Sequence, residues 1–288
     1  TVVDPGPNDA TEPLAQDFSA DRAVHFLDSA SLNWQKERQC FTCHTNYAYL
    51  YARPLISFED EAHATVRGFA EQLVAERWPE HGPRWDAEVV ATAAALAFND
   101  AHTTGTLDPL TRRALDRMWE LQRDDGGWSW LHCDWPPMES DDDYGVTLAA
   151  LAVAVAPDDY AQTDAARKGL AGIQKYLAGN PPPTLHHEAM LLWAASYLPE
   201  LMTDEARAEC LQQLSDRQLD DGGWSLPSLG DWEREDGTPQ IVDRSDGYGT
   251  GFVLYILRRG GVEPSDERIT RGVAWLKANQ RESGRWFT

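Results

Sequence analysis

Apolar residues recur at helical spacing in six segments of the chain. Within each segment they follow one another at intervals of three and four, and each segment opens near a Ser, Thr or Asp. This spacing predicts amphipathic helices with capped amino-terminal ends. The six segments are 21–35, 61–77, 111–123, 164–177, 204–218 and 266–280.

Five segments between these amphipathic ones are apolar almost throughout. They cover 47–57, 88–98, 143–156, 188–198 and 249–258. A segment without a polar face predicts a helix that is buried on all sides. Outer amphipathic helices therefore alternate with inner apolar ones, which is typical of stacked or closed helical repeats. The sequence stops at Thr288, before a sixth inner helix. We expect a further segment, a partner chain or the N-terminal arm to complete the pattern.

A short motif marks the end of the outer helices. It reads Gln, three residues, a small residue, one residue and an aromatic, and its clearest copies are 122–128, 218–224 and 280–286. Degenerate copies begin at Gln35, Gln72 and Gln174. The Gln amide can cap a helix end, glycine permits a tight turn, and Trp can pack over the corner. The motif therefore predicts a structural clamp.

The repeated motif resembles the QW repeats of terpenoid cyclases and of protein prenyltransferase β subunits. This resemblance covers nearly the whole chain from about residue 20. It implies an all-α fold of the α/α toroid type, a six-fold barrel of helical hairpins. The expected organisation is an extended N-terminal arm, 1–19, followed by one toroid domain, 20–288.

The composition is strongly acidic. With 47 acidic and 25 basic residues the net charge is -22, which repels nucleic acid phosphates and anionic lipid headgroups. Such a surface can still steer a basic redox protein. The longest apolar run, 148–156, is too short to cross a bilayer. The start at Thr1, without an initiator Met, predicts that a leader has been removed.

The first copy of the motif differs from the others because Cys40-Phe41-Thr42-Cys43-His44 interrupts it. Over these five residues the chain resembles a c-type cytochrome, in which two thiols bond the haem vinyl groups and the following His binds iron. Three other interpretations stay open. They are a Cys40–Cys43 disulfide, a zinc site that adds Cys133, and unmodified thiols.

If haem is bound, His44 is the proximal ligand and a second donor can come from elsewhere in the chain. The repeat phase places His44 level with the acidic start of the third inner helix, and a long loop lies next to that start. The candidates for the sixth iron ligand are His132, His187 and Met138.

Asp142 and Asp143 are candidate catalytic acids. Clustered carboxylates raise one another's pKa, so one of them can stay protonated and protonate an alkene. A class II terpenoid cyclase starts its reaction in this way, but Ser140 stands where that family's Asp-x-Asp-Asp motif begins. The acids also suit the start of a helix, where they cap it and favour its dipole. The zinc triad of the prenyltransferases has no clear match here.

The sequence thus predicts an exported c-type haem protein, periplasmic or otherwise extracytoplasmic, with an electron-transfer or redox role and a redox partner. Export follows because c-type haem attachment takes place outside the cytoplasm. One alternative is an isoprenoid cyclase, acting on a squalene-like or terpene-like substrate in an apolar central cavity. Another is a non-catalytic interaction subunit whose open ring edge binds a partner.

Overall fold

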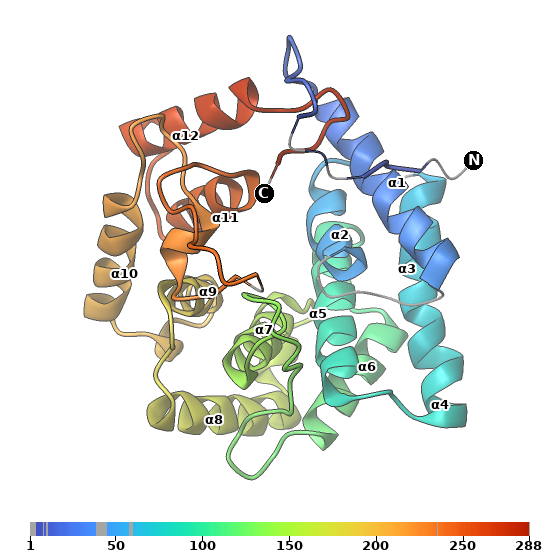
Figure 1. The fold of residues 1–288 in the computed structure, drawn as a ribbon. Coiled ribbons are helices and arrows are strands. Elements are labelled where there is room, and N and C mark those ends of the chain that lie inside the picture. Colours follow the sequence, from blue (N-terminus) through green and yellow to red (C-terminus); the bar gives the residue numbers. More distant parts are fainter. Residues whose placement is uncertain are drawn as a thin grey trace. The chain divides into compact units, whose positions relative to one another are not determined.

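The computed structural model describes residues 4–7, 9, 11–38, 45–57, 60–234 and 236–287. Within these ranges the regular elements are all helical, so the all-α prediction is confirmed (Figure 1). The predicted haem-attachment residues Cys40, Cys43 and His44 lie outside the described residues. The chain divides into two compact units, one built on Leu27–Pro181 and the other on Pro5–Phe26 and Pro182–Thr288. The predicted arm of 1–19 and domain of 20–288 stay a prediction.

The first unit is built around two inner helices that pack side by side, α5 and α7 (Figure 1). Helix α5 is buried from Ala87 to Asp100, and its many alanines let α2, α6 and α7 approach closely. The α-helices described here are α1 (Ala20–Arg38, which begins in the second unit), α2 (Asn46–Ala52), α3 (Glu61–Gln72), α4 (Trp78–His81), α5 (Asp86–His102), α6 (Pro109–Glu120), α7 (Asp142–Val155) and α8 (Asp164–Gly179). Short 3-10 helices cover Arg53–Leu55 and Tyr160–Gln162, and a π-helix covers Leu73–Arg77.

The second unit packs α9 (Leu185–Ala195) and α11 (Gly247–Arg259) against each other. Helix α10 (Asp204–Asp216) lies against α9, and α12 (Glu267–Ala278) lies against α11. Their core is apolar and centres on the fully buried Trp224. Short 3-10 helices cover Pro199–Leu201 and Leu226–Leu229.

All eleven predicted helical segments contain helix, with two differences in detail. The segment predicted over 47–57 leaves the α-helix after Ala52, because Pro54 has no N–H to continue the hydrogen-bond ladder. The segment predicted over 61–77 changes from α3 to a π-helical turn at Leu73. The periodicity of apolar residues does not distinguish an α-helical turn from a π-helical one.

The three clear Gln-Gly-Trp motifs adopt one geometry. In the first, Gln122 Nε2 donates to the carbonyls of Gly126 (2.9 Å) and Gly169 of α8 (2.9 Å). In the second, Gln218 Nε2 donates in the same way to Gly222 (2.8 Å) and Arg268 of α12 (2.9 Å). The Gln therefore ties its own turn to another outer helix, which is a wider role than the predicted cap of its own helix end.

The third motif ties its turn to the beginning of α1. Gln280 Nε2 donates to the carbonyls of Gly284 (3.1 Å) and Ser19 (2.9 Å), and Gln280 Oε1 accepts from the Ser19 N–H (2.7 Å). Glu12 adds a carboxylate that accepts from Ser283 N (2.8 Å) and Arg285 Nε (2.9 Å). Residues of the N-terminal arm thus complete this clamp.

The Trp of each motif fixes the turn to the helix that precedes it. The indole N–H donates to a carbonyl ten residues earlier: Trp128 to Met118 (2.8 Å), Trp224 to Leu214 (2.7 Å) and Trp286 to Leu276 (2.7 Å). The corner role predicted for these residues is therefore observed.

Candidate functional site

The amino-terminal ends of α2, α5 and α7 lie together in the first unit. Tyr47, near the start of α2, places its hydroxyl 3.0 Å from that of Thr92 in the first half of α5. Ser129, in the loop before α7, donates its N–H to Asp86 at the start of α5 (3.4 Å). Thr45, directly after the predicted haem-attachment motif in the sequence, is the N-cap of α2 at this same end. We call the place where the starts of these three helices meet the amino-terminal end of the first unit.

A buried polar network holds the two helices that flank the motif. Arg53 is almost fully buried and pairs with Asp28 of α1 (Nε to Oδ1, 2.8 Å). Tyr49 of α2 donates its hydroxyl to the same carboxylate (2.8 Å), and Asn46 Nδ2 donates to the Ser31 carbonyl (3.0 Å). These contacts tie α1 to α2 and to Arg53, which directly follows α2.

Asp141 is the capping residue of α7, as one of the two interpretations of the acidic cluster predicted. Its carboxylate accepts from the Tyr144 N–H (3.1 Å). A carboxylate at this position satisfies a free backbone donor and favours the positive end of the helix. The capping interpretation is therefore correct for Asp141.

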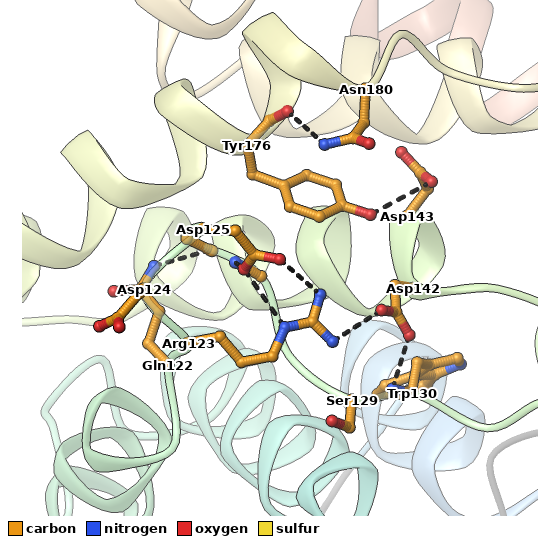
Figure 2. Close-up of polar contacts among 12 residues, drawn as sticks. Gln122, Arg123, Asp124, Asp125, Ser129, Trp130, Asp142, Asp143, Tyr176 and Asn180 are labelled. Carbon is orange, nitrogen blue, oxygen red and sulfur yellow. Dashed lines mark hydrogen bonds and ion pairs between the residues drawn. The ribbon is translucent and has the colours of Figure 1, made fainter.

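Asp142 joins three other parts of the unit (Figure 2). It accepts from Trp130 N (2.9 Å) and from Arg123 Nη1 (2.7 Å), and it lies 3.1 Å from His132 Nε2. Burial raises the pKa of Asp142, but these hydrogen bonds outweigh burial and lower it below the usual value. Asp142 is therefore held as a carboxylate, which disfavours the role of proton donor.

Asp143 points toward α8 (Figure 2). The hydroxyl of Tyr176 donates to its carboxylate at 3.4 Å. Burial, followed by the negative charges of Asp143 and Asp142, raises the pKa of Tyr176. The phenol therefore stays neutral and remains a donor. Of the two acids predicted as catalytic, Asp142 is thus the one that pairs with Arg123, and Asp143 binds the Tyr176 hydroxyl.

Arg123 and Tyr176 are site residues that the sequence did not single out. Arg123 lies inside the motif, between Gln122 and Asp125, and holds both Asp125 (3.1 Å) and Asp142. The only signal was a difference between copies, since the equivalent position of the second clear motif is Leu219. Tyr176 lies inside the degenerate copy that begins at Gln174, at one of the three variable positions of the motif.

In the second unit, Asp246 alone makes the two kinds of contact that Asp141 and Asp142 make separately, a helix cap and a hydrogen bond from a loop N–H. It caps α11 by accepting from Gly249 N (2.7 Å), and it accepts from Leu226 N (2.5 Å). Burial raises its pKa despite these hydrogen bonds. At the related starts of α7 and α11, the pKa of Asp142 is therefore lowered and that of Asp246 is raised.

The three candidates for a sixth iron ligand are not all in one place. His132 and Met138 lie in the loop before α7, where the Met138 carbonyl accepts from the Trp130 indole (2.7 Å). The His132 side chain is 64% exposed. His187 is buried in the second unit, and its Nδ1 lies 2.8 Å from the Thr184 hydroxyl. The first unit thus brings His132 and Met138, but not His187, to its amino-terminal end.

Aromatic side chains surround the buried His186 in the second unit. Its ring stacks on Phe252 with the centroids 4.4 Å apart, and its Nε2 lies 2.9 Å from the Tyr248 hydroxyl. Trp232 meets the same ring edge-on. Tyr248, Phe252 and Trp232 are each only partly buried, so this cluster has a face that is open.

The described part of the chain contains two free thiols. Cys133 is exposed, and Cys210 is buried, which raises the pKa of its thiol to about 12. Among the described residues, no three His, Cys, Asp or Glu side chains gather in a group that could hold a metal ion. The zinc alternative needs Cys40, Cys43 and His44, so it stays a prediction.

Comparison with known proteins assigns no family to the chain. No protein-family model matches the chain, and no curated protein matches it. Among the helices described, none has both the length and the apolar character to span a membrane.

Proposed function

We propose that this chain is a c-type haem protein with an electron-transfer role. The observation that carries the proposal is the Cys40-Phe41-Thr42-Cys43-His44 sequence, because two thiols at this spacing followed by His suit covalent haem attachment. Bound haem would supply one-electron oxidation and reduction. Haem attachment of this type would also require an extracytoplasmic location.

The surroundings of the motif are compatible with this role. The network of Arg53, Asp28 and Tyr49 fixes α1 and α2 on either side of it, so the two thiols and His44 would be presented from a rigid support. Cys40 and Cys43 would hold the group and His44 would bind its iron. These are the donor types that the group requires.

Of His132 and Met138, we favour Met138 as a second donor to the iron. His132 Nε2 is engaged by Asp142, so ligation through that atom would break a contact to a carboxylate. The Met138 hydrogen bond uses only the backbone carbonyl. A thioether donor raises the reduction potential of haem relative to a second imidazole, so this choice has a measurable consequence.

We propose the α/α toroid as the arrangement of the whole chain. Its support is the repeated clamp, in which α6 is tied to α8, α10 to α12, and α12 to the start of α1. If the remaining outer helices follow the same order, the series returns to its beginning. The N-terminal arm would then help to close the ring, which is one of the three alternatives that the sequence left open.

The haem proposal is tested by expressing the chain with and without a c-type haem maturation system. We expect a Soret band and a haem stain that survives denaturing electrophoresis, both lost in a Cys40→Ser, Cys43→Ser variant. Cys133→Ser and Cys210→Ala are matched controls, because these thiols lie elsewhere, and both should keep the stain. A colourless protein from maturation-competent cells would refute the proposal.

Binding of an apolar molecule is a second candidate function, favoured by the partly open aromatic cluster of Phe252, Tyr248 and Trp232 around His186. Such clusters bind apolar or cationic groups. The cyclase reaction itself finds less support, because the Trp130 N–H and Arg123 lower the pKa of Asp142 and favour its carboxylate form. An unchanged product profile after Asp142→Asn and Asp143→Asn with a squalene-like substrate would dismiss it.

A further inference from the structure

A short hairpin projects a large aromatic side chain from the amino-terminal end of the first unit. Cys133 N donates to the Glu139 carbonyl (2.7 Å), and Glu139 N donates to the Trp135 carbonyl (3.0 Å). The Trp130 indole anchors the base through the Met138 carbonyl (2.7 Å). We call residues 132–139 the Trp135 hairpin. Its bonds hold the backbone in place while Trp135 remains 63% exposed.

A second exposed tryptophan lies beside the loop that carries this hairpin. Trp85 precedes the first turn of α5 and is 50% exposed. The next residue, Asp86, accepts the N–H of Ser129 in the loop that leads to the hairpin. Trp85 and the Trp135 hairpin are therefore presented by adjoining elements.

The charge around these two side chains is negative. Asp124, Asp125 and Asp134 are all exposed at this end. The nearby Arg123 is paired with Asp125 and Asp142. Arg84 lies 3.8 Å from the Glu88 carboxylate. Both arginines thus lie against carboxylates, Lys175 of α8 donates to the Asp124 carbonyl (2.7 Å), and the chain as a whole carries a net charge of -22.

We propose that the amino-terminal end of the first unit is the docking face for a basic protein partner. Trp135 and Trp85 would be its apolar anchors, and the exposed carboxylates of Asp124 and Asp134 its steering charges. Tryptophans are common among the residues that dominate binding energy, and a side chain on a fixed hairpin loses little entropy on binding. A second copy of this chain is disfavoured as the occupant, because its net charge has the same sign.

The identity of the partner rests on the proposed function. If haem is attached at Cys40 and Cys43, its attachment residues come shortly before α2 in the sequence. A protein docked on Trp135 and Trp85 would then approach the haem. The partner would be a one-electron carrier with a lysine-rich face, since opposite charge raises the association rate.

The proposal is tested with a basic cytochrome c as the probe and an acidic ferredoxin as its counterpart. Calorimetry at low salt should detect binding of the cytochrome alone, weakening as salt is raised. Trp135→Ala and Trp85→Ala should each weaken it about tenfold or more, while Val273→Ala, an exposed apolar residue of α12 in the second unit, should not. Unchanged thermal melting would show that each variant is folded.

Two results would overturn the docking face: no salt-sensitive binding of the basic probe, or equal affinity in the wild type and both Trp variants. Because calorimetry needs no haem, it separates this proposal from the haem proposal. Trp-dependent binding by a colourless protein would refute only the redox role. Haem-containing protein whose electron transfer to the probe ignores both Trp substitutions would refute only the docking face.

Discussion

Asp142 and Asp246 occupy similar positions before two inner helices and yet differ in their tendency to ionise. Arg123 and the Trp130 N–H stabilise the charged form of Asp142. Asp246 has backbone donors but is more deeply buried, and its pKa is raised. Hydrogen bonds from Trp130 N and Arg123 therefore outweigh burial at Asp142, whereas burial outweighs the hydrogen bonds at Asp246.

Asparagine substitutions should reveal this contrast. Asp142→Asn should lower the free energy of unfolding by about 1–2 kcal/mol at neutral pH, because Arg123 loses a charged partner. Since the Asp142 pKa is lowered on folding, its contribution is complete above the usual aspartate pKa. It is lost as pH falls through the lowered value. The loss caused by Asp142→Asn should therefore shrink only in strong acid.

Asp246→Asn should behave in the opposite sense. Asn can keep the cap of α11, and it removes a charge that burial disfavours, so the variant should be as stable as the wild type at neutral pH or slightly more stable. Any advantage should fade as pH falls through the raised Asp246 pKa. Urea unfolding across a pH series measures both variants. A destabilisation of equal size in both would contradict the assigned environments.

The residue-scale features differ in how far the sequence revealed them. The capping role of Asp141 was predictable, because it depends on residues three apart. The pairing of Arg123 with Asp142 was not, since it joins positions 19 apart in the chain across a folded loop. The placement of His132 beside Asp142 depends on the same loop.

At the scale of elements, each clear clamp depends on a glycine with a positive φ. Gly126 has φ +96°, and a Cβ added there would lie 1.9 Å from the Gly172 carbonyl oxygen of α8. A side chain would therefore meet both an unfavourable backbone conformation and the main chain of another helix. The glycine permits the turn and also permits the helices to approach.

Gly126→Ala should accordingly be far more damaging than Gly105→Ala. Gly105 also has a positive φ, +68°, but an added Cβ would meet nothing within 4 Å. We expect a loss of about 1 kcal/mol for Gly105→Ala, from backbone strain alone. Gly126→Ala should lose roughly 4 kcal/mol or more, or fail to fold. Chemical denaturation of both variants measures the difference, and equal losses would contradict the close approach of Gly126 to α8.

The order of elements was predictable because inner and outer helices differ in their apolar pattern over many residues. The residues that bind each clamp across the fold were less predictable. The motif indicated that Gln280 marks a corner, but not that its amide binds Ser19, 261 positions away. The carboxylate that Glu12 supplies to Ser283 and Arg285 also comes from the arm, where no motif indicated it.

At the scale of the whole molecule, the repeated clamp supports the fold, and the haem-attachment sequence carries the proposed function. The clamp explains how helices are held, and its Gln, Gly and Trp residues are occupied by that task. The proposed function depends on the first copy, where Cys40, Cys43 and His44 interrupt the pattern. The described residues add a network that ties α1 to α2 and an acidic face with exposed tryptophans.

The most direct test of the haem proposal is the mass of the tryptic peptide that begins at Gln39, after cleavage at Arg38. This peptide carries both Cys40 and Cys43. In protein from cells with c-type haem maturation, we predict that its mass exceeds the sequence mass by one haem and that the haem remains bound under denaturing conditions. An unmodified peptide, or one that has only lost two hydrogens to a disulfide, would contradict the proposal.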